Sequence, residues 1–228
     1  MGQNILKLIK PADIITLINA LMGFASIIMT LKGEIEVSLV FILLAVIADG
    51  ADGAVARYSG FGILGANLDS LSDVISFGVA PAVVSYAALS KLGNLALVFP
   101  AFFMVCGTLR LARFNVSGKK DGFEGIPITA GGFIVALFLL VKDIVPYFEY
   151  TFSVLLFILS LLMVSTISYP KIKNPLTIAP MIIVLMFNIV AFYLGLTDLV
   201  KKGSLLLFIL IMVYVLSPVG MKLYDRNK

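Results

Sequence analysis

The stretch DGADGAVARYSGFGILGANLDSLSD, residues 49–73, places four aspartates and one arginine inside an otherwise strongly apolar chain. A charged side chain in a membrane-spanning segment is costly and is rarely kept there without a function. The apolar runs on both sides of the glycine-containing centre, residues 59–62, predict two helices joined by a tight turn. The acids of this stretch are therefore expected to lie at one end of a helix pair.

The composition predicts an all-α integral membrane protein. The chain of 228 residues is 61% hydrophobic and only 13% charged, and its mean hydropathy is +1.09. Soluble domains carry about 25% charged residues, and apolar runs near the length that crosses a bilayer recur along this chain. We predict one transmembrane domain, residues 1–228, whose bundle covers residues 13–219. Its eight predicted helices are residues 13–31, 36–58, 64–90, 93–115, 126–146, 150–168, 175–195 and 203–219.

The basic residues predict the orientation of this bundle. With eight spans, both termini lie on one side of the membrane. Twelve of the 17 Lys and Arg residues then fall on the side of the termini, which the positive-inside rule makes cytoplasmic. We therefore predict a multi-pass cell-membrane protein with the aspartate-rich stretch at the cytoplasmic face. Residues 1–10 are expected to lie on the membrane surface as an amphipathic segment. The net charge of +4 fits contact with anionic membrane lipids and indicates no nucleic-acid partner.

The spacing of the four aspartates predicts a metal site. Asp49 and Asp52 are three residues apart, and Asp69 and Asp73 are four apart, so each pair lies on one helical face. Four converging carboxylates would repel one another unless cations lie between them. The chain has no histidine and a single cysteine, so the ligands are oxygens, which suit Mg²⁺, Mn²⁺ or Ca²⁺. We expect two ions; the alternative is that each aspartate is a solvated charge at a helix end.

Gly53 and Arg57 suggest what these ions would hold. Gly53 follows Asp52 and leaves room for a flat, bulky ligand to lie against the backbone, although small residues in membrane helices also serve close packing. Arg57, one turn further on, suits a ligand with several phosphate oxygens. Anchoring at the cytoplasmic membrane surface is the alternative for Arg57.

These residues together resemble a known signature, that of the CDP-alcohol phosphotransferases. The matching pattern is Asp49-x2-Asp52-Gly53-x2-Ala56-Arg57-x7-Gly65-x3-Asp69-x3-Asp73. The resemblance implies the fold of that family and a CDP-activated lipid bound by the residues of the signature. It also implies a binuclear metal site formed by its four aspartates. Gly53 would admit the cytidine, Arg57 would contact phosphate, and Asp73 would be the base for the incoming hydroxyl.

Two further segments resemble the serine-transferring branch of the family, the bacterial and archaeal phosphatidylserine synthases. Thr16-Leu17-Ile18-Asn19 lies in the first predicted helix, and LRLARFN, residues 109–115, is followed by FEGIP, residues 123–127. The resemblance implies transfer of a phosphatidyl-type group from CDP-diacylglycerol or CDP-archaeol to L-serine, with release of CMP. It also implies a homodimer. Asn19 is expected to contact either the CDP-lipid or a neighbouring helix.

A serine acceptor requires a cation for its carboxylate and an acceptor for its ammonium group. Arg110 and Arg113 share a helical face near the predicted cytoplasmic end, and Glu124 follows in the next loop. We predict that one or both arginines bind the serine carboxylate or a lipid phosphate, and that Glu124 binds the ammonium. The alternatives are membrane anchoring for the arginines and a solvated loop position for Glu124.

Two other functions remain open from the sequence. A sibling enzyme of the same family would use glycerol phosphate or inositol phosphate, for which a denser basic pocket is expected. A divalent cation carrier would use the carboxylates as transport ligands. Against a carrier, all four aspartates are predicted at one membrane end, without acids near mid-depth in the other spans to continue a path.

Overall fold

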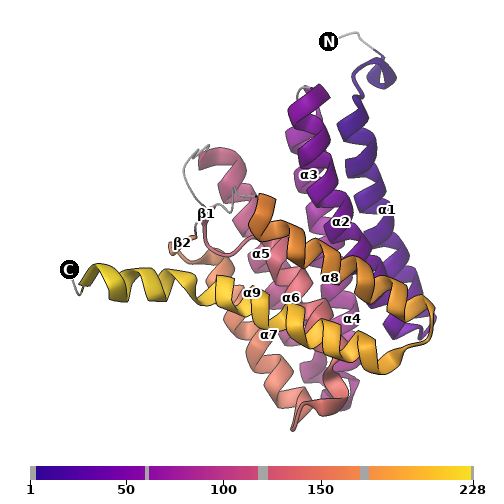
Figure 1. Cartoon of the computed structure of the whole chain (residues 1–228), viewed down its shortest axis with the longest axis vertical. Helices are drawn as coiled ribbons and strands as arrows, with labels where there is room; N and C mark the ends of the chain where they lie inside the picture. The colour runs from indigo at the N-terminus through magenta and orange to yellow at the C-terminus, as the bar shows by residue number, and fades with distance from the viewer. Residues whose placement is uncertain (1–3, 60–61, 118–122, 170–174, 227–228) are drawn as a thin grey trace.

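A computed structural model describes residues 4–59, 62–117, 123–169 and 175–226, which are almost entirely helical (Figure 1). Its α-helices are α1 (Pro11–Leu31), α2 (Ile35–Ser59), α3 (Gly65–Asp73), α4 (Ala80–Ala88), α5 (Val98–Ser117), α6 (Ile128–Leu140), α7 (Phe148–Val164), α8 (Pro175–Tyr193) and α9 (Thr197–Arg226). A π-helical segment (Val74–Val79) joins α3 to α4. Short 3-10 turns cover Ile5–Lys7, Ser90–Leu97 and Lys142–Ile144, and two-residue strands form β1 (Phe123–Glu124) and β2 (Ser168–Tyr169).

The predicted series of eight apolar helical segments is confirmed, but the helix predicted over residues 126–146 is much shorter, and the last helix begins at Thr197 and not at residue 203. Within the described ranges, five segments are long and apolar enough to cross a membrane: Pro11–Leu31, Ile35–Tyr58, Gly65–Ala88, Ser90–Val116 and Thr197–Pro218. Two shorter apolar helices are Ile128–Leu140 and Phe148–Val164, and a third apolar stretch, Ala179–Tyr193, lies within the 19-residue α8. At 1.5 Å per residue, α6 extends over about 20 Å, less than the roughly 30 Å of a bilayer core.

The position of α6 explains why it can be short. Every residue from Gly131 to Leu140 is buried, and α6 packs against α2, α7, α9 and the π-helical segment. A helix enclosed by protein does not have to match the thickness of the lipid, because its ends can meet polar groups inside the bundle. The hydropathy of such a central helix resembles that of a lipid-facing span, which is why its length was overestimated.

The third predicted span is one continuous helix from Gly65 to Ala88, and its π-helical segment begins directly after Asp73. This segment packs tightly on α1. A Cβ placed on Gly23 would lie 2.5 Å from the Ser76 hydroxyl oxygen, and that hydroxyl donates a hydrogen bond to the Asn19 carbonyl at 2.8 Å. Small residues allow such close approach between membrane helices. The contact holds Asp73 beside α1.

Helices α8 and α9 form a hairpin that runs across the long axis of the molecule, whereas α1 and α2 run along it (Figure 1). The two helices are held together in their apolar surroundings by a hydrogen bond of 2.8 Å between the Asn188 amide and the Ser204 hydroxyl. A pattern of apolar residues indicates that a segment can span a membrane but not how far it tilts. The crosswise arrangement was therefore not predicted.

Ion pairs join the turns at the end of the bundle where α2 begins. Lys201 of α9 contacts Asp143 at 2.9 Å, and Lys91 contacts Glu149 of α7 at 3.0 Å. Glu36, in the first turn of α2, also interacts electrostatically with Lys201. Asp49 lies about 20 Å further along α2 at 1.5 Å per residue. The aspartates thus lie well away from these ion pairs.

Candidate active site

Three aspartates from two helices converge as the sequence predicts. One carboxylate oxygen from each of Asp49, Asp69 and Asp73 lies within 4.8 Å of the other two. Asp49 belongs to α2, and the other two belong to α3. The main packing partner of both helices is α1, so three helices, and not the tight turn alone, bring the acids together.

The fourth aspartate faces α1. The Thr16 hydroxyl donates a hydrogen bond of 2.7 Å to Asp52 Oδ2, and the Asp52 side chain is buried. The Ser72 hydroxyl in turn donates to the Thr16 carbonyl at 2.8 Å, which ties α3 to the same turn of α1. Asp52 still interacts electrostatically with Asp49, Asp69 and Asp73. It therefore lies beside the three-residue cluster, oriented by a threonine that we did not predict as a site residue.

The aspartate cluster fits a divalent cation. Asp73 is 7% exposed, and its Oδ1 has no hydrogen-bond partner among the described residues. A buried carboxylate oxygen beside two more carboxylates is unfavourable unless a cation or a proton compensates the charge. An oxygen-only donor set suits a hard ion such as Mg²⁺ or Mn²⁺. The geometry and the donor chemistry agree with a metal site here.

A second missed residue is Thr129, in the first turn of α6. Its side chain forms a hydrogen bond with the Asp49 carboxylate. The start of the central helix α6 thus reaches the acidic cluster. A threonine shortly after Pro127 carries no special signal in the sequence, because the contact depends on how α6 is rotated in the bundle.

The residues predicted to bind the CDP-lipid fall into two groups. Gly53 and Arg57 are exposed, and a Cβ placed on Gly53 would meet nothing within 4 Å, so this side of α2 is open to a ligand. The other three residues, Ala56, Gly65 and Asn19, are buried or pack against other parts of the protein. Ala56 is buried in α2, and Gly65 faces the carboxylate of Asp13. Asn19 is fully buried, and its side-chain amide has no hydrogen-bond partner among the described residues.

Of the residues predicted to bind serine, Arg110 lies beside the acidic cluster. Its side chain is 6% exposed, its guanidinium carbon lies 5.4 Å from the centroid of the Phe114 ring, and it interacts electrostatically with Asp73. This places a buried cation next to the buried carboxylates. The position agrees with the predicted role of Arg110 without testing it.

Arg113 has a different environment, which does not support its predicted contact with serine. Its guanidinium donates hydrogen bonds to the carbonyls of Val164 at 3.0 Å, Ser165 at 2.9 Å and Met163 at 3.2 Å, and to the carbonyl of Glu124 at 2.7 Å. These are the orphan carbonyls at the end of α7 and one from β1. Arg113 therefore joins α5, α7 and the β1 strand.

The hydrogen bond from Arg113 to the Glu124 carbonyl fixes the loop that contains Glu124 against the end of α7. Glu124 pairs with Ser168 in the two-stranded sheet. Gly125 has φ +73° and packs on the Met163 carbonyl, so a side chain would fit neither the backbone conformation nor the space. The glycine of the FEGIP segment, Gly125, is therefore required by the structure of the loop. The half-buried side chain of Glu124 remains a predicted ammonium contact.

Replacing Arg113 with glutamine should destabilise the protein. The change removes the charged donor and leaves several carbonyls at the end of α7 without a partner, at a cost of about 2–4 kcal/mol. We expect a melting temperature in detergent several degrees lower, measured by intrinsic tyrosine fluorescence. The exposed Lys142, replaced by glutamine, is the control and should melt like the wild type. An unchanged melting temperature for Arg113→Gln would show that the arginine has no bracing role.

Helix α9 also reaches the site region. Tyr214 of α9 interacts electrostatically with Arg110, and its ring centroid lies 5.7 Å from that of the buried Tyr169 in β2. Burial raises the pKa of the Tyr169 phenol above its ordinary value. Neither tyrosine was predicted as a site residue, because both occur in sequence context typical of membrane spans and their ends.

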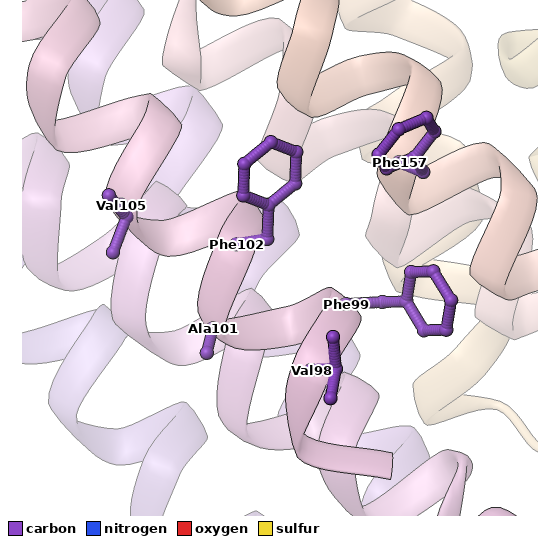
Figure 2. Close-up of a pocket in the computed structure, with 6 residues that line it drawn as sticks. All are labelled: Val98, Phe99, Ala101, Phe102, Val105 and Phe157. Atoms are coloured by element: carbon purple, nitrogen blue, oxygen red, sulfur yellow. The ribbon is translucent and has the colours of Figure 1, made fainter. Parts of the chain in front are cut away.

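A cavity elsewhere on the surface does not share this chemistry. It encloses about 430 Å³ and is lined by apolar side chains from the first half of α5 and from α7 (Figure 2). Phe102 and Phe157 stack at its wall with ring centroids 5.7 Å apart. The lining offers no group that could bind a charged headgroup or a metal ion. We therefore place the candidate active site at the aspartate cluster.

The chain belongs to the CDP-alcohol phosphatidyltransferase family, as the resemblance predicted: the sequence model of that family matches residues 10–166. It is 36% identical over 176 residues to the archaetidylserine synthase of Methanothermobacter thermautotrophicus, covering 75% of this chain and 74% of that protein. It is also 40% identical over 177 residues to the CDP-diacylglycerol–serine O-phosphatidyltransferase of Methanocaldococcus jannaschii, with 77% and 81% covered. The protein of the same name from Helicobacter pylori is 34% identical over 174 residues, with 71% and 72% covered.

Proposed function

We propose that this protein is a membrane enzyme that transfers a phosphatidyl-type group from CDP-diacylglycerol or CDP-archaeol to the hydroxyl of L-serine and releases CMP. The observation that carries the proposal is the convergence of Asp49, Asp69 and Asp73 to within 4.8 Å inside the family signature. The names of the similar proteins support serine as the acceptor. The reaction belongs to phospholipid biosynthesis.

The aspartates would hold the cofactor. Asp49, Asp69 and Asp73 would bind one Mg²⁺ or Mn²⁺ directly, and Asp52 beside them would complete a site for two ions. Bound ions of this kind neutralise the charge of a pyrophosphate and of the departing CMP. The open side of α2 at Gly53 would receive the cytidine, and the exposed Arg57 would contact a phosphate.

Asp73 is the proposed general base. The serine hydroxyl oxygen would attack the phosphorus that carries the lipid, and the bond from that phosphorus to CMP would break. CMP would leave with the bonding electrons, and the hydroxyl proton would pass to the Asp73 carboxylate. The chain has no histidine, so a carboxylate is the natural acceptor for this proton. Asp73 Oδ1, which has no hydrogen-bond partner among the described residues, is the oxygen proposed to accept it.

Arg110 is the proposed contact for the serine carboxylate, and Glu124 for the ammonium group. Arg110 is buried and close to Asp73, so a carboxylate bound there would bring the serine hydroxyl toward the proposed base. A charge-assisted pair formed out of contact with bulk water binds strongly.

Replacing Arg110 with glutamine should raise the KM for serine about 10- to 100-fold, because the serine carboxylate loses its charged partner. This change in KM corresponds to about 1.4–2.8 kcal/mol of lost binding free energy. The KM for the CDP-lipid should change by less than about threefold, since the cytidine and phosphate contacts are elsewhere. Steady-state assays with purified protein in mixed micelles would measure both values. The Lys142→Gln protein serves again as control. An equal rise in both KM values would remove Arg110 from the acceptor site.

The same assay tests the proposed function itself. Wild-type protein with Mn²⁺ should release CMP with L-serine and should be inactive with glycerol phosphate and inositol phosphate. Turnover with either phosphate acceptor and none with serine would identify a sibling enzyme. Metal flux into sealed vesicles without nucleotide, and no transfer to any acceptor, would identify a cation carrier.

We also propose that the active site and both termini face the cytoplasm and that the protein is a homodimer. The excess of Lys and Arg on the side of the termini supports the orientation. The homodimer rests on analogy with the family. Residues 1–10 are proposed to lie on the cytoplasmic membrane surface, where Lys7 and Lys10 can contact lipid headgroups.

A further inference from the structure

Asp13, an acid outside the family signature, lies buried next to the candidate active site. It stands in the first turn of α1, and its side chain is 1% exposed. Its Oδ2 accepts a hydrogen bond from the backbone N–H of Lys10 at 2.8 Å. This bond caps α1, but it uses only part of the hydrogen-bonding capacity of the carboxylate. A buried charge is expensive, so a further contribution to the structure is expected.

The Asp13 carboxylate occupies the space beside two glycines at the start of α3. A Cβ placed on Gly62 would lie 2.9 Å from Asp13 Oδ2, and a Cβ placed on Gly65 would lie 3.3 Å from Asp13 Oδ1. Both distances are shorter than ordinary contacts of a methyl group. Gly65 was predicted to bind the CDP-lipid, but its Cβ position points at this carboxylate. The glycine therefore makes room for Asp13.

In the described part of the chain, the start of α3 has no side-chain cap. Its N-cap residue is Leu64, whose side chain makes no capping hydrogen bond. The first N–H groups of a helix carry a partial positive charge, and an anion near them is stabilising. Asp13 places a negative charge from α1 at this position. Its Oδ1 lies 3.3 Å from a Cβ placed on Gly65, the first residue of α3, so its charge stabilises this end of the helix by proximity.

The location of this contact matters because α3 carries two of the converging aspartates. Asp69 lies about one turn from the start of α3, and Asp73 lies one turn further. One turn along α1 from Asp13, Thr16 holds Asp52 by its hydroxyl. A single face of α1 therefore holds both the start of α3 and an aspartate of α2.

We infer that Asp13 is a positioning residue that sets the start of α3 relative to α2 and thereby the distance from Asp49 to Asp69 and Asp73. The inference deepens the proposed function and rests on it for the identity of the bound ions. Asp13 itself does not touch the reacting atoms. Its loss should loosen the metal site more than it slows the transfer step.

The first test replaces Asp13 with asparagine, which has the same shape without the charge. The concentration of Mn²⁺ that gives half-maximal activity should rise about 5- to 50-fold, while kcat at saturating Mn²⁺ stays within about threefold of wild type. Direct titration of Mn²⁺ in the presence of CDP, followed by electron paramagnetic resonance, should show the same shift. Asp198→Asn is the matched control, because Asp198 is an exposed acid in the first turn of α9. An unchanged Mn²⁺ dependence in the Asp13→Asn protein would overturn the inference.

The second test remains informative even if the first variant folds poorly. Gly65→Ala in the wild-type background should lower the melting temperature, because the new methyl group meets the Asp13 carboxylate. The same change in an Asp13→Ala background should have a much smaller effect, because the space is then free. Equal effects of Gly65→Ala in the two backgrounds would contradict the contact.

The two ideas can fail separately. Wild-type protein that binds Mn²⁺ but does not use serine would refute the proposed function, and the Mn²⁺ titration and the melting cycle would still decide the role of Asp13. Normal activity with serine and an unchanged Mn²⁺ titration in Asp13→Asn would refute the inference alone.

Discussion

Replacing Asp73 with asparagine should lower the rate of transfer to serine by at least about 10³-fold while the protein still binds the CDP-lipid. Asparagine has nearly the same shape as aspartate, but its amide cannot take the proton of the attacking hydroxyl. Loss of a general base typically costs about 10²–10⁴-fold in rate. Asp73 is also the most deeply placed member of the three-aspartate cluster, so we expect the upper part of that range.

Binding should survive in this variant because Asp49, Asp69 and Asp52 keep their charges. CMP release with serine measures the rate, and the rise in melting temperature on adding Mn²⁺ and CDP measures binding. Asp143→Asn, in an exposed acid paired with Lys201 at the distant end of the bundle, is the control. Near-normal turnover of Asp73→Asn would show that another group accepts the proton.

Replacing Asp49 with asparagine should abolish the metal-dependent binding of nucleotide. Asp49 is the contribution of α2 to the three-residue cluster, so its loss leaves acids from α3 alone in direct contact. We expect the Kd for CDP in the presence of Mn²⁺ to rise by at least about 100-fold, which corresponds to about 2.8 kcal/mol. Isothermal titration of the purified protein measures this value.

A chelator should have the same effect on the wild-type protein, and added Mn²⁺ should reverse it. Asp52→Asn should also weaken nucleotide binding. Comparison with Thr16→Val separates the effect of the Asp52 charge from the effect of its orientation. That variant removes the hydroxyl that orients Asp52 while keeping its charge. Retention of Mn²⁺-dependent CDP binding by Asp49→Asn would count against the metal site.

The sequence predicts those parts of the site that depend on spacing within one helix. Asp69 and Asp73 share a face because they are four residues apart, and the short connection between α2 and α3 brings Asp49 to the same end of the bundle. The resemblance to the family signature adds the expected ligand and the proposed role of Asp73 as general base. The order of the apolar helices follows from hydropathy in the same way.

Contacts between helices could not be predicted, because they depend on how each helix is rotated and tilted. The hydrogen bonds of Thr16 to Asp52 and of Thr129 to Asp49 require particular faces of α1 and α6 to meet α2. The role of Asp13 depends on how closely α1 approaches Gly62 and Gly65. The crosswise direction of α8 and α9 has no pattern in the sequence either.

The arginines illustrate the same limit. Arg110 and Arg113 are three residues apart and share a face in the sequence pattern, which suggested one role for both. In the structure, Arg110 lies near Asp73, whereas Arg113 donates to the carbonyls at the end of α7. The difference arises because β1 and β2 pair and bring the end of α7 beside Arg113.

The most direct test of the account is the location of bound manganese. Crystals of the protein grown with Mn²⁺ and CDP should be measured at the manganese absorption edge. The account predicts anomalous peaks within ligand distance of the carboxylates of Asp49, Asp69 and Asp73, with the pyrophosphate of CDP bound to the same ions. CDP bound in the absence of such peaks, or manganese bound only away from these three carboxylates, would contradict it.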